Sequence, residues 1–241
     1  MLERFGMMDA KPQLTPLPHK CVLVERAPDE DPLPPQYPYR ALVGSLLYVG
    51  MWTRPDISFA VSQVARFQQD PTENHWHAAK HILRYLKGTR DLGLTFSSPK
   101  GDAQGELLRG YVDASWGEDP STRKSQSGFV FTLGNAAIAW KSKLQTTVAL
   151  SSTEAEYLAL STAVKDALFL RNLMGDLMPS QSKTVTLFED NQSSIKQASN
   201  LQSSESEPST LMSVITSSST MLQMETLLWS ISLLKISQLI Y

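Results

Sequence analysis

The 241 residues of the chain are enough for one large domain or two modest ones, and an apolar share of 41% is sufficient for a buried core. With 22 basic and 24 acidic residues the net charge is -2, so overall charge does not indicate a nucleic-acid binder, and any such binding would have to be local. A single cysteine, Cys21, excludes an internal disulfide framework and is typical of a reducing compartment.

Two observations concern the location of the protein. The N-terminal sequence MLERFGMMDAKPQ lacks the basic region and hydrophobic core of a signal peptide. The longest apolar tract, near the C-terminus, is interrupted by Glu225 and Lys235 and is too polar for a membrane span. We therefore expect an intracellular protein, in the cytoplasm or the nucleus, that is not secreted and has no membrane partner.

Residues 1–38 are predicted to be an N-terminal segment and a linker. The first part could form one helical turn before prolines end it. Residues 27–38 (APDEDPLPPQYP) are acidic and rich in proline, a composition that is typical of linkers.

Residues 39–104 are predicted to form a small helical segment. The first helix would place five apolar side chains on one face: Tyr39, Leu42, Val43, Leu46 and Leu47. Arg54-Pro55-Asp56 is expected to end this element and to cap the next helix, DISFAVSQVARF. A third helix, ENHWHAAKHILRYLKG, would be closed by Gly88 and carries an apolar stripe: Trp76, Ala79, Ile82, Leu83 and Leu86.

Polar residues of the third helix allow functional interpretations beside the structural ones. His77 and His81, with His75 nearby, have the spacing of zinc ligands, but only His19 remains as a further histidine, so solvated or hydrogen-bonded histidines are favoured. Four basic residues on neighbouring turns could contact phosphates, although a solvated helix face is favoured: Lys80, Arg84, Lys87 and Arg90.

Residues 105–200 are predicted to form an α/β domain. Strands are indicated at LRGYVDAS, SGFVFTLG and AAIAWKSK, with a turn at Gly134-Asn135 that suggests an antiparallel meander. A helix follows at Thr153. The strand TVTLFED would pair in parallel with the first strand because a helical crossover precedes it, which gives a mixed sheet with helices packed on it.

Three carboxylates lie at the ends of these elements. Asp113 ends the first strand, Glu156 lies in the first turns of the helix, and Asp190 ends the last strand. Such positions can converge at one sheet edge, where their oxygens would suit Mg²⁺. We therefore predict that the three side chains approach one another.

The motifs around these acids resemble the ribonuclease H domain of copia-type LTR retrotransposons. They are specific in their order and spacing: YVDASWG, KSQSGFVF, AIAWKSKLQTTVALSSTEAEYLAL and LFEDNQSSIKQASN. In addition, YRALVGSLLYVGMWTRPDISFAVSQVARF is similar to the segment that joins the reverse transcriptase to ribonuclease H in these elements. The resemblance implies a ribonuclease H-like fold after a helical connection segment, in the C-terminal part of a Pol polyprotein.

The resemblance also implies a chemistry. Two Mg²⁺ or Mn²⁺ ions would support hydrolysis of the RNA strand of an RNA/DNA hybrid, with Asp113 bridging both ions and Glu156 and Asp190 each holding one side. The partners implied are the hybrid and the remainder of the polyprotein. No adjacent Asp-Asp pair is present, so the family's polymerase motif is missing and DNA synthesis is not expected.

Two further acids compete for these roles. Glu154 lies two residues before Glu156 and must face another direction on a helix. The family pattern favours Glu156 of EYLAL, which leaves Glu154 to interact with the helix start or to form a capping box with Ser151. Glu189, beside Asp190, should alternate to the opposite face of its strand, where a solvent-facing position is favoured.

Residues 201–241 are predicted to be a divergent tail. The composition shifts after Asn200, and the family's next phrase, similar to RTKHIDVRYHFI and carrying the fourth metal-binding Asp, is absent. Codons from Glu207 onward can be chosen so that a register two bases later encodes TKHIDVRYHFI, and Met221 to Ser230 can likewise encode VANGDIVVEY. We infer an out-of-frame tail from about residue 205, poorly ordered beyond Gln202 or packed as an ad hoc helix.

These observations predict a polyprotein fragment whose ribonuclease H-like domain has weak or no activity. The alternative is a catalytically dead retroelement remnant that acts at most as a nucleic-acid or protein binding module. Metal-dependent cleavage of a labelled hybrid distinguishes the two.

Overall fold

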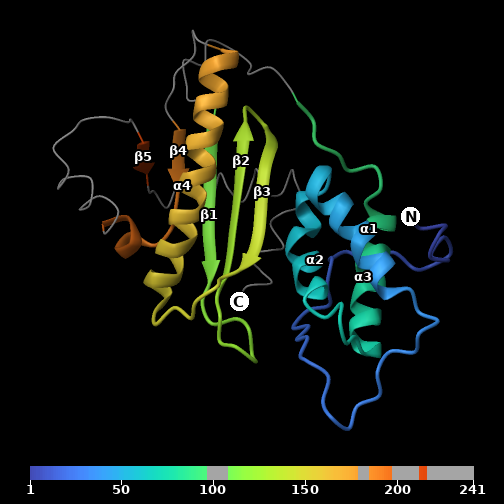
Figure 1. Ribbon diagram of the computed structural model, residues 1–241. Helices are drawn as coiled ribbons and strands as arrows, with labels where there is room; N and C mark the ends of the chain where they lie inside the picture. Colours follow the sequence, from blue (N-terminus) through green and yellow to red (C-terminus); the bar gives the residue numbers. More distant parts are fainter. Residues whose placement is uncertain (97–107, 179–184, 197–211, 216–241) are drawn as a thin grey trace. The chain divides into compact units, whose positions relative to one another are not determined.

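The computed structural model describes residues 1–96, 108–178, 185–196 and 212–215 (Figure 1). The chain divides into two compact units, and the described residues of the first are 1–94. The described residues of the second begin at residue 95. Among the helices in the described ranges, none has the length and apolar character that crossing a membrane requires.

The first unit is helical, as predicted. It contains α1 (Tyr39–Trp52), the 3-10 turn η1 (Pro55–Ile57), α2 (Ser58–Ala65) and α3 (Glu73–Gly88). The predicted apolar stripe of α3 is buried, and Tyr39, Leu42, Val43 and Leu46 of α1 are buried with it. Leu47 is the exception, because it is 36% exposed at the edge of the helix face.

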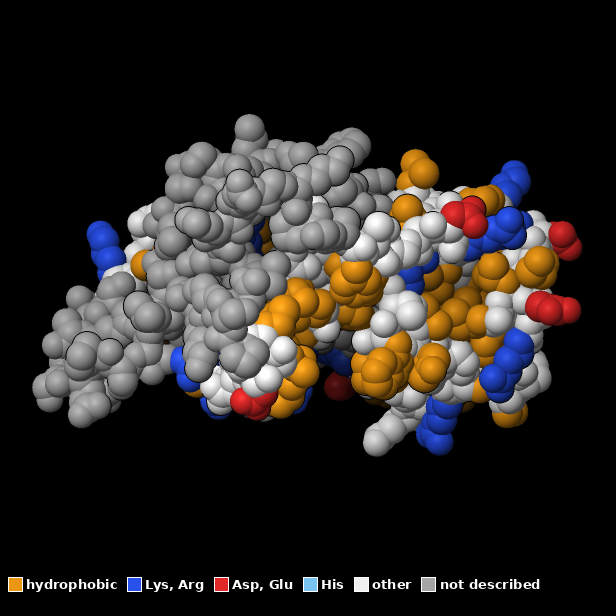
Figure 2. Space-filling view, turned by 90° about the horizontal axis from the view of Figure 1, so that it is seen from above, with side chains coloured by type: hydrophobic (Ala, Val, Ile, Leu, Met, Phe, Trp, Pro, Cys, Tyr) orange, Lys and Arg blue, Asp and Glu red, His pale blue; other side chains and the backbone are white. Residues whose placement is uncertain are grey.

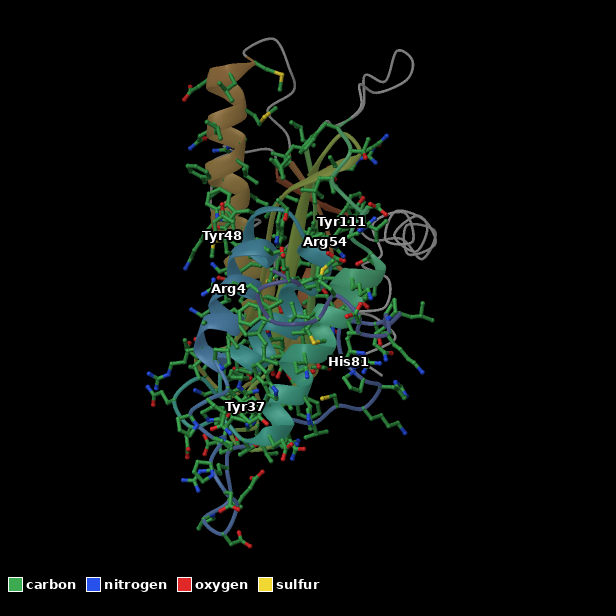
Figure 3. All side chains as sticks on the ribbon, turned by 90° about the vertical axis from the view of Figure 1, so that its right-hand side faces the viewer. Arg4, Tyr37, Tyr48, Arg54, His81 and Tyr111 are labelled. Atoms are coloured by element: carbon green, nitrogen blue, oxygen red, sulfur yellow. The ribbon has the colours of Figure 1, made fainter. Side chains whose placement is uncertain are left out.

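A buried ion pair follows the end of α1, and hydrogen bonds connect it to α3. Arg54 donates from Nε and Nη2 to the Asp56 carboxylate at 2.9 and 2.6 Å, and Tyr85 donates its hydroxyl to Asp56 Oδ2 at 2.7 Å. Arg54, labelled in Figure 3, also donates to the carbonyl and hydroxyl oxygens of Thr89. Arg54-Pro55-Asp56 follows the end of α1, as predicted, but the predicted side-chain cap is absent, since the N-caps Arg54 of η1 and Ile57 of α2 make no side-chain cap hydrogen bond.

Residues 1–38 pack against the helices of this unit. Met7, Leu17 and Leu23 are buried in the helical core, although the segment forms turns and no helix. Two basic side chains of α3 hold its backbone, because Arg84 Nε donates to Lys11 O and Lys87 Nζ donates to Ala10 O, each at 2.8 Å. The prediction that these two side chains are only solvated is therefore wrong.

Hydrophobic side chains also reach the surface of the described part of the chain (Figure 2). On α1, Tyr48, Met51 and Trp52 are each more than half exposed, and Tyr48 and Trp52 have ring centroids 6.5 Å apart. The face of α1 opposite to the core is therefore apolar.

The second unit is built on a mixed sheet, as predicted. Its strands are β1 (Leu108–Ser115), β2 (Gln126–Leu133), β3 (Ala136–Leu144), β4 (Val185–Phe188) and β5 (Met212–Ile215). The order is β3-β2-β1-β4-β5, with β1, β2 and β3 antiparallel and β4 parallel to both β1 and β5. The predicted two-residue hairpin turn is present, since Leu133 pairs with Ala136 and Gly134 has a φ of 61°.

One long helix, α4 (Ser152–Leu177), lies along the sheet (Figure 1). Its small buried residues pack with Val112, Phe131 and Leu187 of the sheet: Ala159, Ala163 and Ala167. Gly110 of β1 is required here, because an added Cβ would lie 2.5 Å from Leu187 Cδ2 and 2.6 Å from Phe131 Cε1. The close approach of these side chains fixes the centre of the core.

The strand β5 is the part of the predicted tail that the structure describes. Residues 212–215 pair in parallel with β4, with Met212 opposite Val185 and Ile215 opposite Phe188, so these four residues are extended and not helical. The backbone edge of β4 can pair with an extended segment, and the β-branched residues Val214 and Ile215 favour the extended conformation. The remainder of the predicted tail lies outside the described residues.

Candidate metal centre

Asp113 is placed by the central strand of the sheet. β1 is paired on both sides, to β2 and to β4, so its backbone is held firmly. Asp113 lies opposite Gly128, which has no side chain to fill the space beside it. Burial, followed by the negative charge of Asp190, raises the pKa of the Asp113 carboxyl above its ordinary value.

Glu156 is placed by the start of α4. Ser151 is the N-cap and accepts a hydrogen bond from the Glu154 N–H at 3.1 Å. The Glu154 carboxylate turns back to the preceding loop, where Oε2 accepts from the Leu150 N–H at 2.7 Å. Glu154 is therefore occupied at the helix start, as predicted, although it does not bond the Ser151 N–H of a capping box. Glu156 is only 6% exposed.

Asp190 is placed by the end of β4. The chain turns there into a short helix over residues 192–196, as predicted, and Asn191 Oδ1 accepts from the Ser193 and Ser194 N–H groups at 3.0 Å. Asp190 itself is exposed. The cap fixes the backbone beside the carboxylate while the carboxylate stays accessible.

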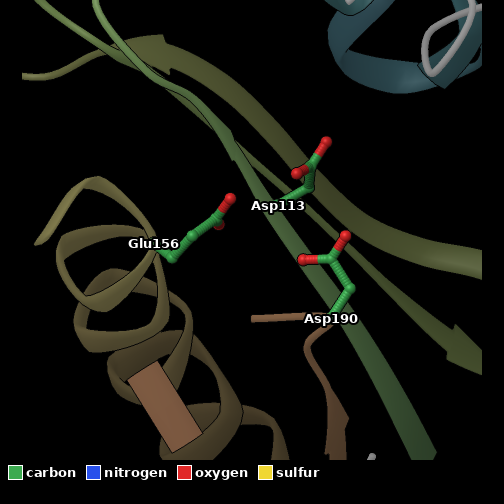
Figure 4. A group of neighbouring side chains, drawn as sticks. All are labelled: Asp113, Glu156 and Asp190. Atoms are coloured by element: carbon green, nitrogen blue, oxygen red, sulfur yellow. The ribbon is translucent and has the colours of Figure 1, made fainter. Parts of the chain in front are cut away.

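The three acids converge, as predicted. Asp113, Glu156 and Asp190 each offer a carboxylate oxygen, and these oxygens all lie within 4.8 Å of one another (Figure 4). They come from β1, α4 and the end of β4, and Figure 4 shows the side chains directed toward one space. Carboxylate oxygens gathered in this way form a possible site for a hard divalent cation.

Glu189 corrects another prediction. It is 4% exposed rather than solvent-facing. The predicted alternation with Asp190 is nevertheless sound, because Glu189 continues the alternation of Val185 and Leu187, which belong to the core beneath α4. The face of β4 that carries Glu189, opposite to the face that carries Asp190, is covered by α4. Val185 and Leu187 in the sequence were the signal that could have revealed the burial of Glu189.

Burial and neighbouring negative charges act on the carboxyl groups of Glu156 and Glu189. Burial raises the pKa of Glu156, and Glu189 is the charge that contributes most to this increase. Burial also raises the pKa of Glu189, against a hydrogen bond in which its Oε1 accepts from the Asn191 N–H at 3.2 Å. Both carboxyl groups therefore favour the protonated form unless a cation is present.

We expect the metal-free stability of the second unit to fall as pH rises from about 5 to about 10, because the raised pKa is about 8 for Glu189 and about 10 for Glu156. The folded state binds these protons more tightly than the unfolded chain, so the stabilisation is present at low pH and is lost as pH rises through the raised pKa values. Thermal unfolding in EDTA across this range measures the effect. Glu156→Gln should flatten the profile, and an unchanged slope in that variant would contradict the assignment.

The histidines of α3 do not form a metal site. His75 is buried, stacks on Phe67 and accepts at Nδ1 from the Thr72 N–H at 2.9 Å, whereas His81 Nε2 lies 3.1 Å from Thr15 O. His77 is exposed beside Glu73. Within the part of the chain that the structure describes, the acidic cluster is the only group of three such residues placed to hold a metal ion.

The fold and the acidic cluster define a class of protein. A mixed sheet in the order β3-β2-β1-β4-β5, with α4 packed on it, is a ribonuclease H-like arrangement. The cluster lies at the ends of the parallel strands, beside the start of the helix.

Comparison with known proteins identifies the relatives. No protein-family model matches the chain. The Retrovirus-related Pol polyprotein from transposon TNT 1-94 of Nicotiana tabacum is 41% identical over 204 residues, 83% of this chain and 15% of that protein. The Retrovirus-related Pol polyprotein from transposon RE2 of Arabidopsis thaliana is 35% identical over 200 residues, 83% of this chain and 13% of that protein.

A shorter relative is the Secreted RxLR effector protein 161 of Plasmopara viticola, 46% identical over 133 residues, 55% of this chain and 91% of that protein. The chain therefore belongs to one sequence family with all three, and the Pol polyproteins match the larger share of it. It is a homologue of a fragment of copia-type, retrovirus-related Pol polyproteins from transposons, and it spans 13 to 15% of the length of the two compared above.

Proposed function

We propose that the second unit is a ribonuclease H-like domain that hydrolyses the RNA strand of an RNA/DNA hybrid with divalent cations. The observation that carries the proposal is the convergence of carboxylate oxygens from Asp113, Glu156 and Asp190, together with a buried Glu156 Oε2 that has no hydrogen-bond partner. A buried carboxylate oxygen without a partner is unfavourable unless a cation or a water molecule satisfies it. The relationship to Pol polyproteins supports the same assignment.

The donor set fits Mg²⁺ or Mn²⁺. All three groups are carboxylates, which such hard cations prefer, and no histidine or cysteine lies among them. When bound, two cations would activate a water molecule and stabilise the leaving oxygen of the phosphodiester.

The three residues would contribute in different ways. Asp113 and Glu156 are held by the central strand and by the first turns of α4, so their positions are fixed before any ligand binds. Asp190 is exposed and would form the side of the site that meets the substrate. Because three carboxylates repel a phosphate group, we expect the hybrid to bind at this site only with divalent cations.

Trp116 supports contact with nucleic acid beside the acids. It follows β1, is 52% exposed, and donates from Nε1 to Ala149 O at 3.0 Å. This bond connects the loop after β1, the strand of Asp113, to the loop before α4, the helix of Glu156. An exposed, fixed indole suits stacking against a base or packing against a sugar.

The remainder of the polyprotein is the other proposed partner, because the Pol relatives are about seven times longer than the part that this chain matches. The activity is proposed to be weak, since the family's fourth Asp is missing from the printed sequence. A catalytically dead remnant that only binds nucleic acid or protein is the alternative.

We expect weak cleavage of a hybrid labelled on its RNA strand, in Mg²⁺ or Mn²⁺, and loss of that cleavage in Asp113→Asn. The asparagine removes a charge from the centre but keeps the size of the side chain, so the loss should be on the order of 10²-fold or more. Asp176→Asn is the matched control, because it removes an exposed acid from the far end of α4. Cleavage that persists in Asp113→Asn would contradict the proposal.

A further inference from the structure

Glu189 has features that the three-acid site does not use. It is 4% exposed, its Oε2 has no hydrogen-bond partner, and its Oε1 accepts a 3.2 Å bond from the Asn191 N–H. No basic side chain pairs with it within the described ranges. An acid buried in this way has lost its hydration without a compensating partner.

One acid of the centre, Glu156, has the same deficiency. Glu156 is 6% exposed and its Oε2 is also without a hydrogen-bond partner. Glu156 lies in the first turns of α4, and Glu189 lies at the end of β4 on the strand face that α4 covers, so the two side chains come from facing elements.

A neutral core residue would be expected at position 189 if burial alone were required. The two residues that share its face, Val185 and Leu187, are apolar and are 2% and 0% exposed. A carboxylate in their place is destabilising by itself, and a divalent cation shared with Glu156 would offset both desolvated charges at once.

We propose that Glu189 is a fourth carboxylate of the metal centre and that it shares a divalent cation with Glu156. The inference rests on the proposed function, because it assigns a further ligand to the same acidic centre. The metal centre then has four acids, all between residues 113 and 190. These four acids bind a first cation although the chain lacks the further Asp that the family carries after them.

Binding of Mn²⁺ to the full chain tests the inference without any measurement of cleavage. Isothermal titration and the electron paramagnetic resonance signal of free Mn²⁺ give the affinity, and the rise in melting temperature on adding Mn²⁺ gives a second readout. Glu189→Gln keeps the shape of the side chain, Glu189→Asp keeps the charge but shortens it, and Asp176→Asn removes an exposed charge elsewhere on the unit.

Glu189→Gln should weaken Mn²⁺ binding about 10-fold or more and reduce the Mn²⁺-dependent rise in melting temperature, with Glu189→Asp in between. In EDTA the Glu189→Gln protein should be at least as stable as the parent chain, which shows that the variant folds. Asp176→Asn should bind Mn²⁺ like the parent chain.

The outcomes separate the two proposals. If Glu189→Gln and Asp176→Asn bind Mn²⁺ equally well while Asp113→Asn does not, the fourth-ligand inference is wrong and the proposed function stands. If the parent chain binds no Mn²⁺, the proposed function itself fails. An Mn²⁺ affinity lowered in Glu189→Gln and partly recovered in Glu189→Asp supports a ligand at this position.

Discussion

Restoring the tail to the shifted reading frame from about residue 207 is expected to increase cleavage of the RNA/DNA hybrid about 10²-fold or more. In the family that the chain resembles, the next segment carries a fourth metal-binding Asp. Without it, a two-metal centre lacks one charge and one coordination position, so the second cation should bind poorly. In our proposal Glu189 serves the first cation and leaves this deficit in place.

The measurement compares initial rates of the two proteins in Mg²⁺ and in Mn²⁺. Asp113→Asn introduced into both gives the background from contaminating nuclease. Equal turnover by the original and the restored protein would contradict the frameshift account. The genomic DNA across codons 195–241 tests the same account independently, because a single insertion or deletion should return the family phrase.

Asp56→Ala is expected to destabilise the first unit by about 3–5 kcal/mol. The change leaves the buried Arg54 guanidinium without its carboxylate and removes the acceptor of the Tyr85 hydroxyl. Side chains of the pair are only 9% and 4% exposed, so water cannot replace the lost partner. Native-state hydrogen exchange of the α3 amides reports this unit separately from the sheet.

An exposed ion pair in the same unit provides the control. Arg26 Nε lies 2.8 Å from Asp70 Oδ2, but the side chains are 27% and 56% exposed. Asp70→Ala should therefore cost less than about 1 kcal/mol. Similar losses of protection in Asp56→Ala and Asp70→Ala would show that burial of the Arg54 pair contributes nothing.

Local sequence patterns predicted much of the second unit. The Gly134-Asn135 turn, the Ser151 cap and the break between the helix and TVTLFED each depend on neighbouring residues, so they predicted the hairpin, α4 and the parallel pairing of β4. These elements determine the strand order, and that strand order brings Asp113, Glu156 and Asp190 together.

Features that depend on distant residues could not be predicted in this way. Alternation along β4 shows that Glu189 and Asp190 face opposite sides, but only the packing of α4 shows which side is buried. The hydrogen bond from Tyr85 to Asp56 spans 29 residues, and that from Arg84 to Lys11 spans 73. No periodic pattern indicates such partners.

Retention of Gly110 among homologous copies of this sequence would indicate selection for a folded core. Every amino-acid replacement that a single base change can produce from a glycine codon adds at least a Cβ, and that atom would collide with Leu187 and Phe131. A copy that accumulates changes freely should therefore lose Gly110 as readily as any other glycine. Copies still under selection for a folded sheet should keep it, including copies whose acidic residues have already changed. Counting Gly110 against Asp113 across such copies would separate selection for folding from selection for catalysis.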